Sequence, residues 1–532
     1  MGSSQTRNLI TTAIYMLLLV SLLVACGSEA LEPPRLVTQT AVVAFTPTPP
    51  GTPLISLVPT PTVDPDLVQR AAETGGEGSP ASAPLADPVE VVTVWINESP
   101  DSHGDRLTNM VDDFVDQSGI DVDLVLVAPD LLPDLVQTAV VSGTLPDIIV
   151  HPFEYSAGWS ADGILDETAA TEALERLGRE TFDTDVLNLL YQDDSGSVPA
   201  IPSDGWQRLI LYRSDWFSDA DLDPPGSYEA ILSAAETFYQ PDSVVSGIVV
   251  PTDSDLISTQ QTFEHIAAAN GCELIDEKGE ITILHPACLE ALEFYRSLIN
   301  QFSPIGVQTD ISSLNAFLAG RTGIIFASPA ALPIIAGLDD EFKPSCPSCT
   351  TPGYLAENTG MLTDLTGSGE FATPANFGSF TSIGITTNAD RSVADPFVDY
   401  WFTEGYPAWI ALAPERRIPV RMGTADSPSS FIDAWIQLPL EGSSSTLADI
   451  YGEESAEQLS LGIPSSSRWG FPEKQSAIIT KLHQEMVLPP LLQEMLSGYF
   501  TSSQTVIEIY LAIIDVIPFY AFPVDIAPTP EP

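Results

Sequence analysis

Hydrophobic and polar positions between residues 88 and 150 change their period several times, and the changes predict alternating strands and helices. The expected elements are strands at 88–95, 122–127 and 146–150 and helices at 107–115 and 131–142, with Gly119 and Gly143 where the helices end. Strand, helix and strand in this order favour a mostly parallel sheet, whose ligands bind beyond the carboxyl ends of the strands.

A second pattern, at 197–228, predicts a passage between two lobes. Val198–Ile201 and Arg208–Tyr212 are apolar and β-prone, and the residues between them include the turn formers Pro202, Ser203, Asp204 and Gly205. A strand therefore leaves one lobe and enters the next. The sequence Pro-Pro-Gly-Ser at 224–227 then predicts a tight loop and the start of another helix.

The composition agrees with a large globular chain and limits its partners. With 532 residues, 44% of them hydrophobic, the chain is longer than one domain normally grows, so we expect two lobes with appendages. Against 73 acidic residues stand only 19 basic ones, and the formal net charge of −54 repels phosphate backbones. We expect no nucleic acid partner. Solubility outside the cell explains the acidity, and a binding surface that uses the acidic residues is the alternative; the charge alone names no ligand.

Both ends of the chain differ in composition from its body. Residues 1–26 contain a short apolar run that ends Leu-Val-Ala-Cys, which is typical of an export signal and similar to a bacterial lipobox with Cys26 as the lipidated residue. An ordinary signal or anchor helix with an incidental cysteine is the alternative. Residues 27–87, rich in Pro and Thr, predict an extended tether, and 527–532 form a Pro-rich tail.

The four remaining cysteines form two close pairs, Cys272 with Cys288 and Cys346 with Cys349. An even number of cysteines in an exported chain favours two short disulfides. Free thiols, or a metal or redox role for the Cys-Pro-Ser-Cys sequence, are the alternatives, although no second motif of this spacing exists to complete a zinc site.

The chain resembles bacterial extracellular solute-binding proteins of the maltose-binding type. The resemblance rests on motifs in the family's order: Val94–Asn97, Gly143–Ile149, Asp162–Asp166, the apolar, Pro, Tyr and Pro-Pro sequence of the passage at 197–228, Ala316–Ile324 and Ile418–Arg421. Each motif is weak alone, but together they extend over about 330 residues. The segment 343–376 departs from the pattern by inserting the second cysteine pair.

This resemblance implies an α/β fold of two lobes, of the type II periplasmic-binding-protein kind, joined by three crossings. The crossings are expected at 201–208, 376–385 and 417–421. The solute-binding domain at 88–526 would then divide into a first lobe of about 88–203 and 384–417 and a second lobe of about 206–376 and 420–520.

The resemblance also implies ligand contacts, because carbohydrate clefts combine aromatic rings with polar groups that bind hydroxyls. By motif position these contacts are Asn97, Glu98, Ser99, Glu154, Trp206, Ser328 and Trp469. Trp206 and Trp469 are expected to line one cleft from the second lobe, with Glu98 and Glu154 opposite. Core packing is the alternative for each tryptophan, and a solvated loop carboxylate is the alternative for each glutamate. His151 is expected to pack against a neighbouring loop.

The family resemblance implies a binding protein that delivers its solute to an ABC importer. We expect a monomer anchored outside the cell membrane, a sugar or oligosaccharide as solute, permease subunits as partners, hinge closure as mechanism, and neither cofactor nor metal. Motifs of hydrolases, zinc proteases and nucleotide-binding enzymes do not occur in the sequence. An anchored glycoside hydrolase and a sensory or adhesion module on the same fold are the alternatives.

Overall fold

The computed structural model describes residues 90–99, 104–461, 463 and 466–516. The predictions for the signal with Cys26, the tether and the tail fall outside these residues. The chain divides into two compact units, 1–85 and 86–532, and every described residue belongs to the second. Within the described ranges, no helix is both long and apolar enough to cross a bilayer.

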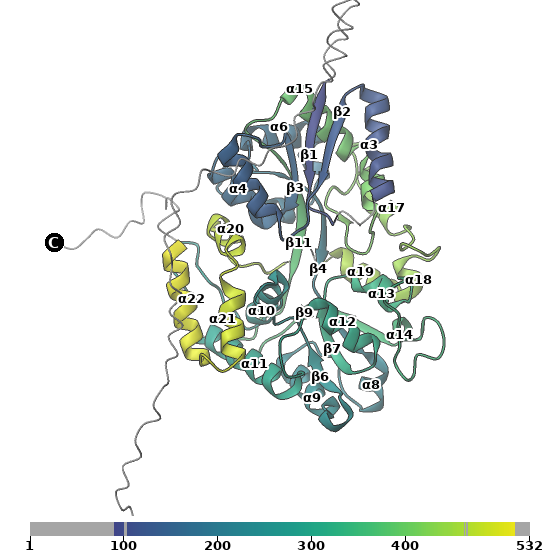
Figure 1. Ribbon diagram of the computed structural model, residues 1–532, viewed down its shortest axis with the longest axis vertical. Helices are drawn as coiled ribbons and strands as arrows, with labels where there is room; N and C mark the ends of the chain where they lie inside the picture. The colour runs from purple at the N-terminus through teal and green to yellow at the C-terminus, as the bar shows by residue number, and fades with distance from the viewer. Residues whose placement is uncertain (1–89, 100–103, 462, 464–465, 517–532) are drawn as a thin grey trace, which may run out of the picture. The chain divides into compact units, whose positions relative to one another are not determined.

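A six-stranded mixed sheet forms the centre of the first lobe (Figure 1). Strand β1 pairs in parallel with β2 and with β3, as the alternating pattern predicts, whereas β11 runs antiparallel to both β3 and β4. In sheet order the strands are β12 (Ile418–Pro419), β4 (Ile201–Gln207), β11 (Gly378–Ile385), β3 (Ile148–Pro152), β1 (Val91–Ile96) and β2 (Asp121–Leu126).

The helices of this lobe bury apolar residues against the sheet. In α3, Leu107, Met110 and Phe114 recur at helical spacing and are almost fully buried, together with Val92 and Val94 of β1. The helices are α3 (Gly104–Ser118), α4 (Leu132–Ser142), α5 (Ser156–Ala161), α6 (Glu167–Leu177), α7 (Thr184–Leu190), α15 (Arg391–Phe402), α16 (Tyr406–Ile410) and α17 (Ser430–Trp435), with the 3₁₀ turns η1 (Phe153–Tyr155) and η2 (Arg179–Thr181).

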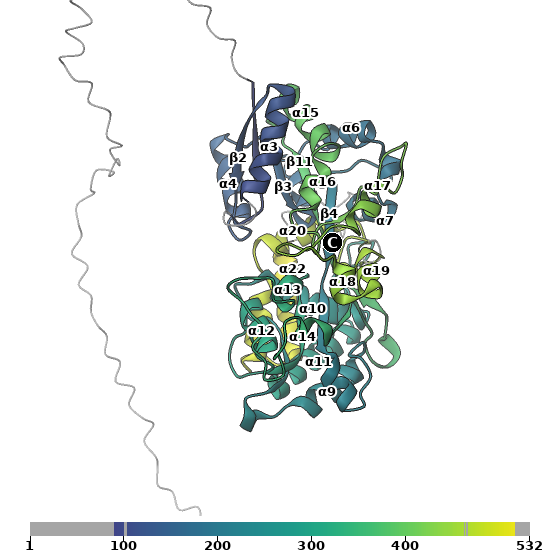
Figure 2. The same ribbon diagram turned by 90° about the vertical axis from the view of Figure 1, so that its right-hand side faces the viewer.

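A four-stranded sheet forms the centre of the second lobe. Its order is β6 (Ser246–Val249), β7 (Thr322–Ala327), β5 (Leu209–Arg213) and β8 (Thr359–Leu362), with β6 and β7 parallel and β5 antiparallel to both of its neighbours. A small antiparallel pair, β9 (Asp364–Leu365) and β10 (Ala375–Asn376), lies next to it in the sequence. Figure 1 shows β6, β7 and β9 grouped apart from β1, β2 and β3, and Figure 2 shows the teal part of the chain that surrounds them below β2 and β3.

The predicted helix after the Pro-Pro-Gly-Ser sequence is present as α9. Ser227 caps it, because its side chain accepts a hydrogen bond from the backbone N–H of Ala230 at 3.2 Å. The helices of this lobe are α8 (Ser214–Asp219), α9 (Tyr228–Phe238), α10 (Ile257–Ala269), α11 (Pro286–Phe302), α12 (Asp310–Leu318), α13 (Ala331–Ile335), α14 (Tyr354–Glu357), α18 (Leu447–Tyr451), α19 (Glu453–Leu461), α21 (Leu488–Leu496) and α22 (Ser502–Val516), with the turns η3 (Pro241–Ser243) and η4 (Gly369–Phe371).

Two of the passages between the sheets run side by side. The chain leaves the six-stranded sheet after Gln207 and enters the four-stranded sheet at Leu209, and it returns between Asn376 and Gly378. The backbone N–H of Arg208 donates to the carbonyl of Phe377 at 2.8 Å, so the two passages are joined. Near the third expected crossing, β12 pairs with β4 through Ile418 and Gly205.

The C-terminal part of the chain differs from the expected division into lobes. Helix α20 (Ser476–Gln484) packs on α5 and η1 of the first lobe, whereas α21 packs on α10 and α22 on α11 of the second. The segment 420–520 therefore contributes to both lobes. The reason lies in one side chain of α20: the hydroxyl of Thr480 donates to the carbonyl of Glu154 and accepts from the N–H of Gly158.

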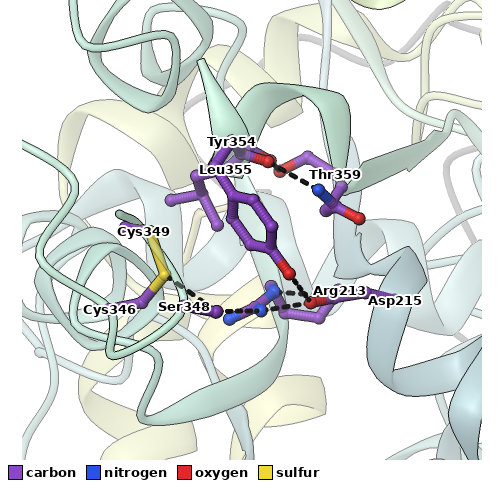
Figure 3. The surroundings of a disulfide bond; sticks show 9 residues. Arg213, Asp215, Cys346, Ser348, Cys349, Tyr354, Leu355 and Thr359 are labelled. Carbon is purple, nitrogen blue, oxygen red and sulfur yellow. Dashed lines mark hydrogen bonds and ion pairs between the residues drawn. A yellow bond between two sulfur atoms is a disulfide. The ribbon is translucent and has the colours of Figure 1, made fainter. Parts of the chain in front are cut away.

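Both cysteine pairs lie at disulfide distance, as the spacing predicts. The Cα atoms are 4.6 Å apart for Cys272 and Cys288 and 5.0 Å apart for Cys346 and Cys349. Figure 3 shows the second pair beside Arg213, which donates to Ser348 between the two cysteines at 3.2 Å. Arg213 also forms an ion pair with Asp215, so this insertion is fastened to the start of α8.

Candidate functional site

A cavity of about 640 Å³ opens where the carboxyl ends of β1 and β3 face the start of α10. This is the edge of the sheet at which the parallel order predicts a ligand. The first lobe, with α20, contributes most of its lining, and the second contributes 255–257 and Gln261. The lining residues are Asn97, Pro129, Asp130, Pro133, Asp134, Pro152, Glu154, Tyr155, Trp206, Asp255, Leu256, Ile257, Gln261, Ser379, Phe380, Thr381, His483, Gln484 and Met486.

Three of the predicted contact residues, Asn97, Glu154 and Trp206, line this cavity. Asn97 directly follows β1, and its backbone N–H donates to the carbonyl of Val150 at 3.0 Å, which fixes the end of the strand. Trp206 is half-buried on β4 and so belongs to the first lobe's sheet, not to the second lobe as expected. Their part in binding a ligand stays a prediction.

Glu154 is 1% exposed and has two partners. The hydroxyl of Ser379 donates to its carboxylate at 3.0 Å, and the guanidinium of Arg468 forms an ion pair with it at 2.9 Å. The alternative of a solvated loop carboxylate therefore does not apply to Glu154. Its carboxylate is held rigidly at the floor of the cavity by partners from distant parts of the chain.

Arg468, which sequence reasoning did not single out, joins the two lobes at this point. Its guanidinium also forms an ion pair with Glu264 of α10 at 2.8 Å and donates to the carbonyl of Gly378 at 2.8 Å. Burial alone would lower the pKa of Arg468, but attraction to Glu264 and Glu154 raises it. Burial raises the pKa of the Glu264 carboxyl even though Arg468 opposes this shift.

Trp469 does not line the cavity. It is 1% exposed, its indole N–H donates to the carbonyl of Cys272 at 2.7 Å, and its ring packs edge-on against Phe263 with centroids 5.9 Å apart. The core-packing alternative therefore accounts for Trp469. The backbone N–H of Trp469 donates to the carboxylate of Glu264 at 3.0 Å, and the same carboxylate pairs with Arg468. Trp469 is therefore held in the interior next to these ion pairs.

Glu98 is also placed differently from the prediction. Its carboxylate pairs with Arg416 at 3.2 Å and with Arg417 at 2.5 Å, and it does not line the cavity. The Arg417 guanidinium lies 3.4 Å above the ring of Trp409, and burial lowers its pKa to about 10. Glu98 thus balances buried positive charge next to the site and faces neither tryptophan.

The two predicted serines are not among the residues that line the cavity. Ser99 is exposed after β1, and Ser328 follows β7, where its carbonyl accepts from the N–H of Ala331 at 3.1 Å. Motif position placed both serines near strand ends, but this nearness does not bring either of them into the cavity wall.

Two polar groups in the cavity wall lack partners within the described part of the chain. His483 is 4% exposed, and neither its Nε2 nor the Nε2 of Gln484 has a hydrogen-bond partner there. Burial lowers the pKa of His483 to about 4, so its imidazole is neutral at pH 7. Buried polar groups normally find partners, and these two groups are therefore available to a polar ligand. No sequence motif pointed to these two residues.

His151 packs in the interior, but against helix α5 and not against a neighbouring loop as expected. It is fully buried, and its ring meets the ring of Trp159 with centroids 5.0 Å apart. Within the described residues, no group of three or more His, Cys, Asp or Glu side chains could hold a metal ion.

Comparison with known proteins agrees with this architecture. The family model described as bacterial extracellular solute-binding protein matches residues 99–344. A putative ABC transporter periplasmic-binding protein of Escherichia coli strain K12, YcjN, is 24% identical over 306 residues, which cover 57% of this chain and 66% of that protein, slightly less than two thirds of its length.

Solved structures share the fold at low sequence identity. The maltose-bound MalE3 of T. maritima aligns with a TM-score of 0.62 at 16% identity and covers 80% of this chain and 100% of its own. A Thermotoga lettingae solute-binding protein bound with alpha-D-tagatose aligns with a TM-score of 0.61 at 17% identity over the same shares. The matched family consists of transport binding proteins, not enzymes. By this match and by its two-lobed sheet order, the chain is similar to the bacterial extracellular solute-binding proteins.

Proposed function

We propose that this protein is the membrane-anchored binding component of an ABC importer and that the cavity lined by Asn97, Glu154 and Trp206 holds a polyhydroxylated solute. The observation that carries the proposal is the composition of that wall: an aromatic ring, an amide and unpartnered polar atoms at the carboxyl ends of β1 and β3. An aromatic face suits the C–H surface of a sugar, and amide groups suit its hydroxyls.

The names of the relatives support the same class of solute. The solved structures include proteins in complex with maltose, with tagatose and with ribitol, which share several hydroxyl groups on a compact carbon skeleton. A cavity of about 640 Å³ lies within the range of small-molecule sites and accepts solutes of this size.

Hinge closure follows from how the wall is divided between the lobes. Most of the lining belongs to the first lobe, and Asp255, Leu256 and Gln261 belong to the second. A solute bound to the first lobe gains its contacts with α10 only when the lobes approach. This difference in contacts shifts the equilibrium toward the closed state, and the paired passages at Arg208 and Phe377 are the axis we propose.

A thermal-shift screen of the purified protein tests the solute class. The panel contains sugars, polyols, amino acids and short peptides. A solute that binds adds about 2.7 kcal/mol to the free energy of unfolding when its concentration is about 100 times its dissociation constant. We expect stabilisation by sugars or polyols only. Stabilisation by amino acids or peptides alone would move the proposal to another solute class.

The anchor is tested separately. In cells, Cys26→Ser should release the protein from the membrane fraction, because the acylated cysteine would be its only attachment in this proposal. Cys346→Ser serves as the matched control, since it removes a cysteine without touching the lipobox. If the Cys26→Ser variant still sediments with membranes, the lipoprotein assignment is wrong.

A further inference from the structure

The charges around the cavity are strongly one-sided. Asp130, Asp134 and Asp255 lie on its rim and are exposed, and none of the three forms an ion pair with another described residue. No lysine or arginine is among the described residues that line the cavity. A solute that enters therefore meets three carboxylates and no positive side chain.

Two buried cations lie behind residues of the cavity wall, and each of them pairs with a carboxylate. Arg468 lies behind Glu154 and is paired with both Glu154 and Glu264. Arg208 is 1% exposed and directs one nitrogen to Gln261 at 3.2 Å and another to Asp310 at 3.7 Å. The imidazole of His483 is neutral at pH 7 because burial lowers its pKa to about 4. No positively charged side chain among the described wall residues therefore balances the rim carboxylates.

Aromatic rings line the same opening. Trp206, Tyr155 and Phe380 all contribute to the wall, and the ring of Tyr155 stacks on Trp159 with centroids 4.9 Å apart, which holds it in place. The face of an aromatic ring attracts an ammonium group, most strongly in tryptophan, and the attraction grows when water is excluded. Aromatic rings and carboxylates without an ion-pair partner both favour the binding of a positively charged group.

We infer that the solute of this protein carries an amino or ammonium group in addition to hydroxyls, as an amino sugar or an amino polyol does. The inference rests on the proposed function and narrows its solute class. It also excludes sugar acids and sugar phosphates, since an anion would face Asp130, Asp134 and Asp255 without a counter-charge.

The test compares solutes that share one sugar or polyol skeleton and differ at one substituent, which is neutral, positive or negative. Isothermal titration calorimetry measures the dissociation constants of glucosamine, glucose and glucuronate, and then of the amino, hydroxyl and carboxylate forms of any other sugar or polyol that binds in the thermal-shift screen. The amino form should bind about tenfold more tightly than the neutral form, since exposed charge pairs are individually weak but three act together here. The anionic form should bind least.

A triple variant with Asp130→Asn, Asp134→Asn and Asp255→Asn should lose most of that tenfold preference for the amino form over the neutral form. The matched control replaces three exposed aspartates outside the cavity, Asp112→Asn, Asp116→Asn and Asp123→Asn, and should keep the preference. Raising the salt concentration from about 0.02 M to about 0.5 M should also reduce the preference in the wild type, because exposed charges are screened.

Each outcome separates this inference from the proposed function. Equal binding of neutral and amino forms, tighter binding of the anionic form, or a preference that survives in the triple variant overturns the inference and leaves the proposed function standing. Failure of every polyhydroxylated solute, charged or neutral, overturns the proposed function itself.

Discussion

The cavity wall at Trp206 and the junction around Arg468 and Trp469 both contact strand β11, yet they are built in opposite ways. Trp206 pairs with Ser379 across β4 and β11, and its half-buried ring faces the opening. Arg468 and Trp469 are almost fully buried, and their polar groups bind partners from both lobes. The first region is left open for a ligand, whereas the second is closed by the protein's own side chains.

The polar neighbours of each tryptophan decide whether it lies in the cavity wall or in the core. The indole N–H and the backbone N–H of Trp469 both donate to buried acceptors, so the residue is committed to the interior. A buried ion pair is weak evidence for stability in itself, but removal of one partner leaves an uncompensated charge. The two regions should therefore respond differently to mutation.

Arg468→Met should show the largest effect. It would leave the carboxylates of Glu154 and Glu264 buried without their cation, and loss of one partner of a buried pair costs about 3–5 kcal/mol. Urea denaturation monitored by circular dichroism measures the free energy of unfolding. The double variant Arg468→Met with Glu264→Gln is the control and should recover part of the loss. An unchanged midpoint for the single variant would show that the junction does not hold the lobes together.

Trp469→Ala should destabilise the fold by about 3–5 kcal/mol, because it empties a fully buried site beside Phe263 and Cys272. The dissociation constant for the solute, measured on the fraction that remains folded, should change little. A large loss of affinity at unchanged stability would return Trp469 to the binding site and contradict its place in the core.

Replacing Cys272 and Cys288 with serine should lower the free energy of unfolding by about 3 kcal/mol, because their disulfide closes a loop with a sequence separation of 16. The Cys346–Cys349 pair, with a separation of 3, serves as the comparison and should cost about 2 kcal/mol by the same chain-entropy argument. Urea denaturation of each double variant beside the wild type, under non-reducing conditions that keep the other disulfide intact, measures the difference. Equal stability of wild type and the first variant would contradict the structural role of this bond at the junction.

A pH series on His483 tests the cavity wall. Burial lowers the pKa of His483 from 6.5 to about 4, so the unfolded chain binds the proton more readily than the folded protein. The stability that the neutral imidazole contributes is therefore lost as the pH falls from 6.5 through 4. His483→Gln removes this group. Between pH 7 and pH 4 the variant should lose less stability than the wild type, by on the order of 2 kcal/mol. Parallel stability curves would show that His483 is not buried in its neutral form.

The sequence was sufficient for the local elements, because their signals lie within one element. The period of Leu107, Met110 and Phe114 predicted α3, and Ser227 marked the start of α9. The positions of Asn97 and Glu154 at the cavity followed from the rule that parallel strands place ligands beyond their carboxyl ends.

The sequence was insufficient where pairing joins distant parts of the chain. Glu98 meets Arg416 at a separation of 318 residues, and Glu154 meets Arg468 at a separation of 314. No periodicity or motif order links such positions. The one available signal for the junction was Arg468, a basic residue next to Trp469 in a chain with few basic residues. The role of Arg468 becomes clear only from its burial in the structure.

The decisive measurement for the solute site is the dissociation constant of Trp206→Ala for the solute selected by the screen, determined by isothermal titration calorimetry beside the free energy of unfolding of the variant. We expect binding to be weaker by about 1–3 kcal/mol, because the ring supplies apolar contact to the ligand, with little change in the unfolding midpoint. Unchanged affinity, with or without a loss of stability, would contradict the claim that this cavity is the solute site.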